Sequence, residues 1–108
     1  MKTQQVTLTT TIPCTVALTK RRFVSLAGAP TAAGAWSPGV AEVDCDPGLQ
    51  AAVNASGIIL VEAGAAIAAG AQVEADAQAR AITLNAGAAN GRALDAAAAA
   101  GDVIRILR

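Results

Sequence analysis

Short runs in which apolar and polar residues alternate are the feature that most constrains this chain. Val6, Leu8 and Ile12 alternate with threonines, and five further runs behave in the same way, at residues 41–46, 49–56, 72–76, 80–84 and 104–106. A period of two is the period of a β-strand whose two faces meet different surroundings. Thr and Val also favour strands over helices. The pattern therefore predicts an all-β fold.

Turn residues separate these runs. Residues 27–39 contain three glycines and two prolines, and Asp46-Pro47-Gly48 is a tight-turn sequence in which Pro presets φ and Gly accepts a positive φ. Further breaks are expected at Gly57 and near residues 69–70, 85–87, 90–91 and 101–102. Strands every 8–12 residues with turns between them indicate a small barrel-like or sandwich domain of short strands.

Two segments need separate interpretation. Residues 58–61 are continuously apolar, which predicts a strand buried on both faces. Residues 94–100 are rich in alanine, the best helix former, but seven residues are too few for a stable isolated helix. We expect a strand near Arg92, an alanine-rich loop, and a final strand over 103–107. A short helix within 95–100 is the alternative.

The chain has few large side chains with which to build a core. It has 108 residues, enough for one domain, with no Tyr and a single Phe and Trp. Most of its apolar content is alanine together with Val, Ile and Leu. A monomer of this composition is expected to be marginally stable, so we infer that copies of itself or another protein supply part of its stability.

Charge excludes several classes of function. The formal net charge is +0, and no basic patch indicates binding to nucleic acid. No apolar run is long enough to span a bilayer, and no basic amphipathic helix indicates a membrane surface. The first 13 residues lack the apolar centre of a signal peptide, which predicts a cytoplasmic product. Cys14 and Cys45 are then expected to be two buried thiols, with a disulfide left open as the alternative.

The sequence offers no catalytic constellation. Histidine is absent, which removes Ser-His and Cys-His nucleophiles and histidine metal ligands. Glu42, Asp44 and Asp46 would share one face of a strand, where they could hold calcium or form an ordinary solvated face; the EF-hand pattern is missing. Residues 85–92 lack the Gly-Lys-Ser/Thr end of a phosphate loop. We expect no enzyme activity, no cofactor and no metal.

Three features are candidate contact sites. Lys20, Arg21 and Arg22 could be a solvated turn or could meet an acidic surface on a partner. Trp36, in the Gly/Pro-rich loop, could anchor an interface or cap the core. The third feature is an expected extended N-terminal arm, residues 1–13, ahead of a single β domain, residues 14–108. This arm could add a strand to another chain or could pair within its own sheet; its candidate contacts are Thr3, Val6, Leu8, Thr10 and Ile12.

An ordered series of small-residue motifs resembles a family of bacteriophage capsid cement or decoration proteins. The resemblance runs from about Phe23 to Leu107. The motifs that carry it are Gly39-Val40-Ala41, Pro47-Gly48 with Val53, residues 57–61, residues 67–73 with Asp76, residues 93–97 and residues 101–106. Two positions depart from the family pattern. The turn after Asp76 reads Ala77-Gln78-Ala79-Arg80 where the family usually has a Gly before Arg-Ala, and Ala71 replaces an acidic or hydroxyl residue.

This resemblance implies a compact β-barrel-like protein on the outer surface of the capsid, often a homotrimer, that binds the major capsid protein and stabilises the expanded head. It implies a virion location after synthesis in the bacterial host cytoplasm, and it brings no catalytic residues. Two alternative functional assignments stay open. One is another virion part, such as a fibre base or tail component. The other is a hammerhead-type carrier domain, suggested by Glu62-Ala63-Gly64 and the Gly70 to Val73 step, although neither Lys2 nor Lys20 sits in the required hairpin.

Overall fold

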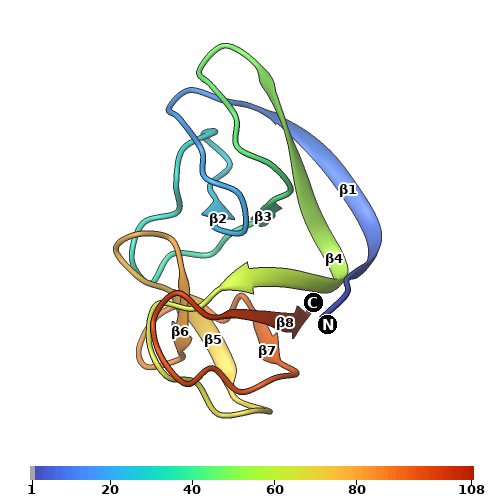
Figure 1. Cartoon of the computed structure of the whole chain (residues 1–108). Helices are drawn as coiled ribbons and strands as arrows, with labels where there is room; N and C mark the ends of the chain where they lie inside the picture. Colours follow the sequence, from blue (N-terminus) through green and yellow to red (C-terminus); the bar gives the residue numbers. More distant parts are fainter. Residues whose placement is uncertain (1) are drawn as a thin grey trace.

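The computed structural model describes residues 2–108, which form a single antiparallel sheet of eight strands folded around two cores (Figure 1). The strands are β1 (Gln5–Pro13), β2 (Phe23–Val24), β3 (Gly39–Ala41), β4 (Gln50–Glu62), β5 (Gln72–Ala75), β6 (Ala81–Thr83), β7 (Gly91–Ala93) and β8 (Val103–Leu107). The order in the sheet is β2-β3-β4-β8-β7-β5-β6, and β1 pairs with β4 outside this path. The all-β prediction is confirmed, while the sheet is not closed into a barrel.

The central element is β4, which takes part in both halves of the sheet. Its first part pairs with β1 and, at Val53 and Asn54, with β3; its last part, from Ile58 to Glu62, pairs with β8. In Figure 1 this green strand runs down beside the blue β1, then turns toward the red β8. The sequence predicts a break between strands at Gly57, and this prediction is wrong, because Gly57 lies inside β4.

Gly57 is where the direction of β4 changes. Its φ is +108°, which side chains rarely tolerate, and a Cβ there would lie 2.3 Å from the carbonyl oxygen of Gln5 and 2.8 Å from the amide of Thr7. Register shifts in the β1–β4 ladder lie between Val6 and Leu8 and between Leu8 and Thr9. Glycine at this position lets the irregular part of β1 cross β4 closely.

Two clusters of buried side chains fill the structure. The upper core consists of Ile12, Cys14, Leu18, Val24, Ala41, Cys45, Ala51 and Val53. The lower core consists of Phe23, Val40, Ile59, Val61, Ala63, Ile67, Val73, Ala75, Ala79, Ala81, Ala93, Ala97, Ile104 and Ile106. Cys14 and Cys45 are both free, buried thiols, as expected, and burial raises the pKa of Cys45, with further contributions from its neighbour Cys14 and from Asp46.

The apolar run at residues 58–61 is not buried on both faces. Ile59 and Val61 are fully buried, whereas Ile58 and Leu60 are only half-buried. The reason is that only one face of β4 packs on the lower core. The predicted strand over 41–46 is also shorter than expected: β3 ends at Ala41, and Cys45 forms an isolated bridge with Leu18 instead.

The C-terminal part follows the expected order of strand, alanine-rich loop and strand. The loop between β7 and β8 contains no helix, because side chains hold it in a different shape. The carboxylate of Asp102 accepts hydrogen bonds from the amides of Ala98 and Ala99. Asp95 accepts bonds from the backbone amide of Arg105 at 3.0 Å and from its guanidinium at 2.9 and 3.0 Å, and the side-chain bonds, more than the other effects, lower the pKa of Asp95 to about 2.

Candidate functional site

The N-terminal segment completes its own sheet. β1 pairs with β4 from Gln5 to Pro13, so the structure shows the second of the two alternatives for this part of the expected arm, residues 1–13, of which Met1 lies outside the described residues. Ile12 is buried in the upper core, Val6 is half-buried, and Thr3, Leu8 and Thr10 are exposed. Deleting residues 2–12 would therefore remove a core side chain and uncover β4.

The basic cluster divides into residues with different roles. Arg22 reaches Glu62 at 3.4 Å, and the backbone amide of Lys20 donates to Asp44 at 2.8 Å. Arg21 makes no side-chain hydrogen bond or ion pair with any residue in the described part of the chain, and it is half-buried. Its φ of +62° is unusual for a residue with a side chain. Its backbone is fixed by bonds to Ala41 and Glu62, so this turn is held in shape while the guanidinium stays available.

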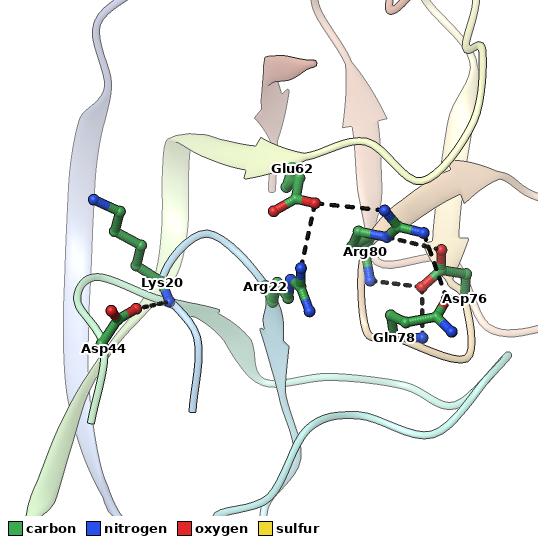
Figure 2. Close-up of polar contacts among 7 residues, drawn as sticks. All are labelled: Lys20, Arg22, Asp44, Glu62, Asp76, Gln78 and Arg80. Atoms are coloured by element: carbon green, nitrogen blue, oxygen red, sulfur yellow. Dashed lines mark hydrogen bonds and ion pairs between the residues drawn. The ribbon is translucent and has the colours of Figure 1, made fainter. Parts of the chain in front are cut away.

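Glu62, at the end of β4, joins two arginines that come from different parts of the chain (Figure 2). Its Oε2 lies 3.4 Å from Arg22 and 3.6 Å from Arg80, and Arg80 also lies 3.4 Å from Asp76. Figure 2 shows Glu62 between these two guanidinium groups, with Lys20 and Asp44 standing apart. The four side chains are 14–31% exposed. We interpret this group as a structural clasp that ties β4, β2 and the turn before β6 together.

The turn over residues 76–80 explains one departure from the family pattern. Asp76 Oδ1 accepts the amides of Gln78 and Arg80, and the carbonyl of Ala79 accepts the amide of Phe23. Ala79 has a φ of +61°, a conformation that suits glycine, but its methyl group is fully buried in the lower core. Burial of that methyl offsets part of the strain.

Trp36 lies on a loop that is held in place by the hydrogen bonds of its neighbour Ser37. Its side chain is 54% exposed, which is consistent with an interface residue more than with a core cap. The neighbouring Ser37 is fully buried: its hydroxyl bonds to Val24 and Gly39, its amide to the side chain of Asn90, and its carbonyl to Arg108 at 2.7 Å. Burial lowers the pKa of Arg108. Trp36 is thus a large exposed side chain on a rigid support.

Sequence reasoning missed a set of exposed aliphatic side chains beside the upper core. Val16, Leu26 and Leu49 are 51%, 71% and 58% exposed. Their loops are joined through residues 14 and 15: Cys14 donates to the carbonyl of Leu49, Thr15 donates to Gly28 through its amide, and the Thr15 hydroxyl donates to Ala27. We call these three side chains the aliphatic tip. Isolated Val and Leu between turn residues were the available signal, but the sequence did not show that the three loops meet.

The acidic residues do not form a cation site. Glu42 lies outside a strand and accepts hydrogen bonds from Gln4 and from the side chain of Asn54. Asp44 is engaged by Lys20. Within residues 2–108, no group of three or more His, Cys, Asp or Glu side chains is placed to hold a metal ion. The same residues include no helix long and apolar enough to cross a membrane.

Comparisons with known proteins point in one direction. A family model described as phage cement protein matches residues 1–108. The crystal structure of the head fiber gp8.5 N base in bacteriophage phi29 has a similar fold, with a TM-score of 0.76 and 17% sequence identity, over 93% of this chain and 92% of that one. At this identity the likeness concerns the fold alone. No curated protein sequence matches the chain.

Proposed function

Because the chain belongs to the phage cement protein family, we propose that it is a structural protein of the virion that binds the outer surface of the capsid and stabilises the expanded head. The partner in this proposal is the major capsid protein, and the protein is made in the cytoplasm of the bacterial host. The observation that carries the proposal is the family match over the whole chain. It assigns no catalytic role and no cofactor.

A contact with the capsid needs side chains that are exposed but already held in place, since ordering them on binding would weaken the complex. Trp36 meets this requirement, because the bonds of Ser37 fix its loop. Tryptophan is also enriched among the residues that dominate binding energy. We place Trp36 at the centre of the contact.

Arg21 is the second proposed contact. Residues with side chains rarely persist at a positive φ unless the surrounding structure holds them there, and such positions concentrate at functional sites. Here backbone bonds to Ala41 and Glu62 fix the turn, and the half-buried Arg21 makes no side-chain hydrogen bond or ion pair within residues 2–108. Its guanidinium would meet an acidic patch on the capsid protein, a contact that weakens with added salt.

The fold likeness to a head fibre base favours a second candidate function, in which the chain is the base of a capsid fibre. In both cases the protein binds the shell. The trimer that the family resemblance implies belongs to the proposal as well, and mass measurement of the purified protein by sedimentation tests it.

The main experiment is co-sedimentation with DNA-filled, expanded capsids of the phage that encodes the chain, with unexpanded proheads as the comparison. We expect saturable binding to the expanded shell alone. Absence of binding to either particle would overturn the proposal.

Two variants test the contact. Trp36→Ala should weaken binding at least tenfold with an unchanged melting temperature. Arg21→Gly should weaken binding and its salt dependence while making the domain slightly more stable, because glycine suits the φ of +62°. Thr83→Ala, an exposed change on β6, is the matched control. Wild-type binding by both contact variants would remove these two residues from the interface.

A further inference from the structure

The outer edge of β1 pairs with no other described strand, and only at its end does a loop cover it, where Gly28 lies against the carbonyl oxygen of Pro13. β1 pairs with β4 on one side and with no other strand in the described residues, and Figure 1 shows it at the outer margin of the molecule. Natural sheet edges are usually guarded by charged side chains, by shortness or by a covering segment, because unpaired amides and carbonyls recruit further strands. β1 is nine residues long, and no charged residue occurs from Thr3 to Thr19.

The register shows which backbone groups are unpaired. Cys14 donates to the carbonyl of Leu49, and in the same register Ile12 faces Ala51 and Thr10 faces Val53. Alternate residues of a strand point their backbone groups to opposite edges. Thr10 and Ile12 therefore bond to β4, while the amides and carbonyls of Thr9 and Thr11 point outward.

Two independent observations agree with this assignment. The carbonyl of Ala52, the partner of Thr11, accepts the amide of Glu42 on the β3 side and so points away from β1. Pro13 has no amide hydrogen, and it occupies a position whose amide would point outward. Proline is found on strand edges for this reason.

The sequence of this edge is nearly the same in both directions. Residues 8–12 read Leu-Thr-Thr-Thr-Ile, and they follow the irregular part of β1. An antiparallel copy centred on Thr10 would place Thr9 opposite Thr11 and Leu8 opposite Ile12. Thr–Thr and apolar cross-strand pairs are both favourable, and no like charges meet. The outward groups of Thr9 and Thr11 fall opposite one another, as a hydrogen-bonded pair requires.

We propose that this edge binds a second copy of the chain, with the two β1 strands antiparallel about a two-fold axis at Thr10. The contact does not depend on the proposed capsid function, and it is separate from the proposed trimer, because a two-fold contact pairs two copies and cannot close a ring of three. It joins two sheets into one. On a capsid surface it would link neighbouring copies laterally, using a part of the molecule distant in sequence from Trp36.

A disulfide cross-link tests the register. Thr10 of the two copies would form a non-hydrogen-bonded pair, whose side chains approach closely. Thr10→Cys is treated with oxidised glutathione: two introduced thiols give up two protons and two electrons, one S–S bond forms, and two glutathione thiols are released. We expect a covalent dimer of twice 10.6 kDa on a non-reducing gel. Thr11→Cys is the matched control, since its partner at this register is Thr9, and it should cross-link no more than the wild type with its two buried thiols.

Backbone chemistry provides the second test. Thr11→Pro removes one outward amide and leaves the β1–β4 ladder intact, whereas Thr11→Val keeps the amide. We expect sedimentation equilibrium, at concentrations up to about 100 µM, to show self-association weakened at least tenfold in Thr11→Pro alone, because only this variant lacks the outward amide. Its melting temperature should be unchanged. A wild-type protein with the same association state as Thr11→Pro, or equal cross-linking by both cysteine variants, would overturn the proposal. If the two proteins do not differ in self-association and Thr11→Pro nevertheless loses capsid binding, the edge binds a strand of the capsid instead, and the proposed function is left standing.

Discussion

The surroundings of the two cores differ in the side chains they leave in solvent. Near the upper core, Leu8, Val16, Leu26, Val43 and Leu49 are each more than half exposed. The loops around the lower core, residues 64–71, 84–90 and 95–102, expose no large apolar side chain and consist mainly of Ala, Gly, Asn and Asp. Exposed apolar side chains that gather in one region indicate an interaction surface. The upper region is therefore suited to partners, as is the separate loop of Trp36, whose neighbour Ser37 bonds to Asn90 in the lower region, whereas the three loops of the lower region offer no such side chains.

The largest effect on stability is expected from a substitution in β4, the strand that both regions share. Gly57→Ala should lower the free energy of unfolding by about 3 kcal/mol, because it combines a strained φ with contact against the backbone of β1. Urea denaturation measures it. Gly48→Ala is the control: φ is +91° but nothing lies within 4 Å of the new Cβ, so only backbone strain of about 1 kcal/mol is expected. Equal losses in the two variants would contradict the close crossing of β1 and β4.

A milder test compares the cores directly. Val53 and Val73 are both 0% exposed, one in each core. Val53→Ala and Val73→Ala should each lower the free energy of unfolding by about 2 kcal/mol, from lost burial and the cavity left behind. A much smaller loss for Val53→Ala, measured by the same denaturation, would show that the upper core relaxes around the cavity and is the looser of the two.

A pH titration tests one ion pair of the lower region. The pKa of Asp95 is lowered to about 2 in the folded protein from a usual value of 3.8, so the stabilisation from its Arg105 pair is complete above about pH 4 and is lost as the pH falls toward 2. Asp95→Asn should lower the free energy of unfolding by about 1 kcal/mol at neutral pH, a modest figure because the pair is partly exposed. In the variant, the free energy of unfolding should also fall less between pH 4 and pH 2 than in the wild type. An unchanged acid profile would contradict this contribution of Asp95.

The smallest effect on stability is expected at the aliphatic tip. Leu26→Gln and Leu49→Gln should change the free energy of unfolding by less than about 0.5 kcal/mol, because both side chains are mostly in solvent. Under the proposed function they should nevertheless reduce capsid binding in co-sedimentation. Ala66→Gln and Ala98→Gln introduce the same side chain on exposed loops of the lower region and should bind normally. Normal binding by the leucine variants would show that the aliphatic tip does not contribute to capsid binding.

Much of the fold was predictable because the strand period depends only on residues that are neighbours in the sequence. The final strand over 103–107, the short strand at Arg92 and the alanine-rich loop between them are all confirmed. The breaks were less certain, since a glycine can mark a turn or a crossing. Gly57 belongs to the second kind, and only the close approach of Gln5, 52 residues earlier in the chain, shows which.

The candidate site was predicted less well, because it depends on which loops meet. The sequence singled out residues 20–22 as one basic cluster, whereas the fold engages Arg22 with Glu62 and leaves Arg21 unpaired. The expected carboxylate face of Glu42, Asp44 and Asp46 disappears because β3 ends at Ala41. The aliphatic tip could not be seen at all, since its three side chains come from segments up to 33 residues apart.

The course of β4 also bears on how the domain unfolds. One strand supplies Ala51 and Val53 to the upper core and Ile59 and Val61 to the lower core. Neither core can come apart without releasing a segment on which the other is built. Heat and denaturant should therefore produce a single cooperative transition, and the amides along the middle of β4 should exchange with solvent only as slowly as the whole molecule opens.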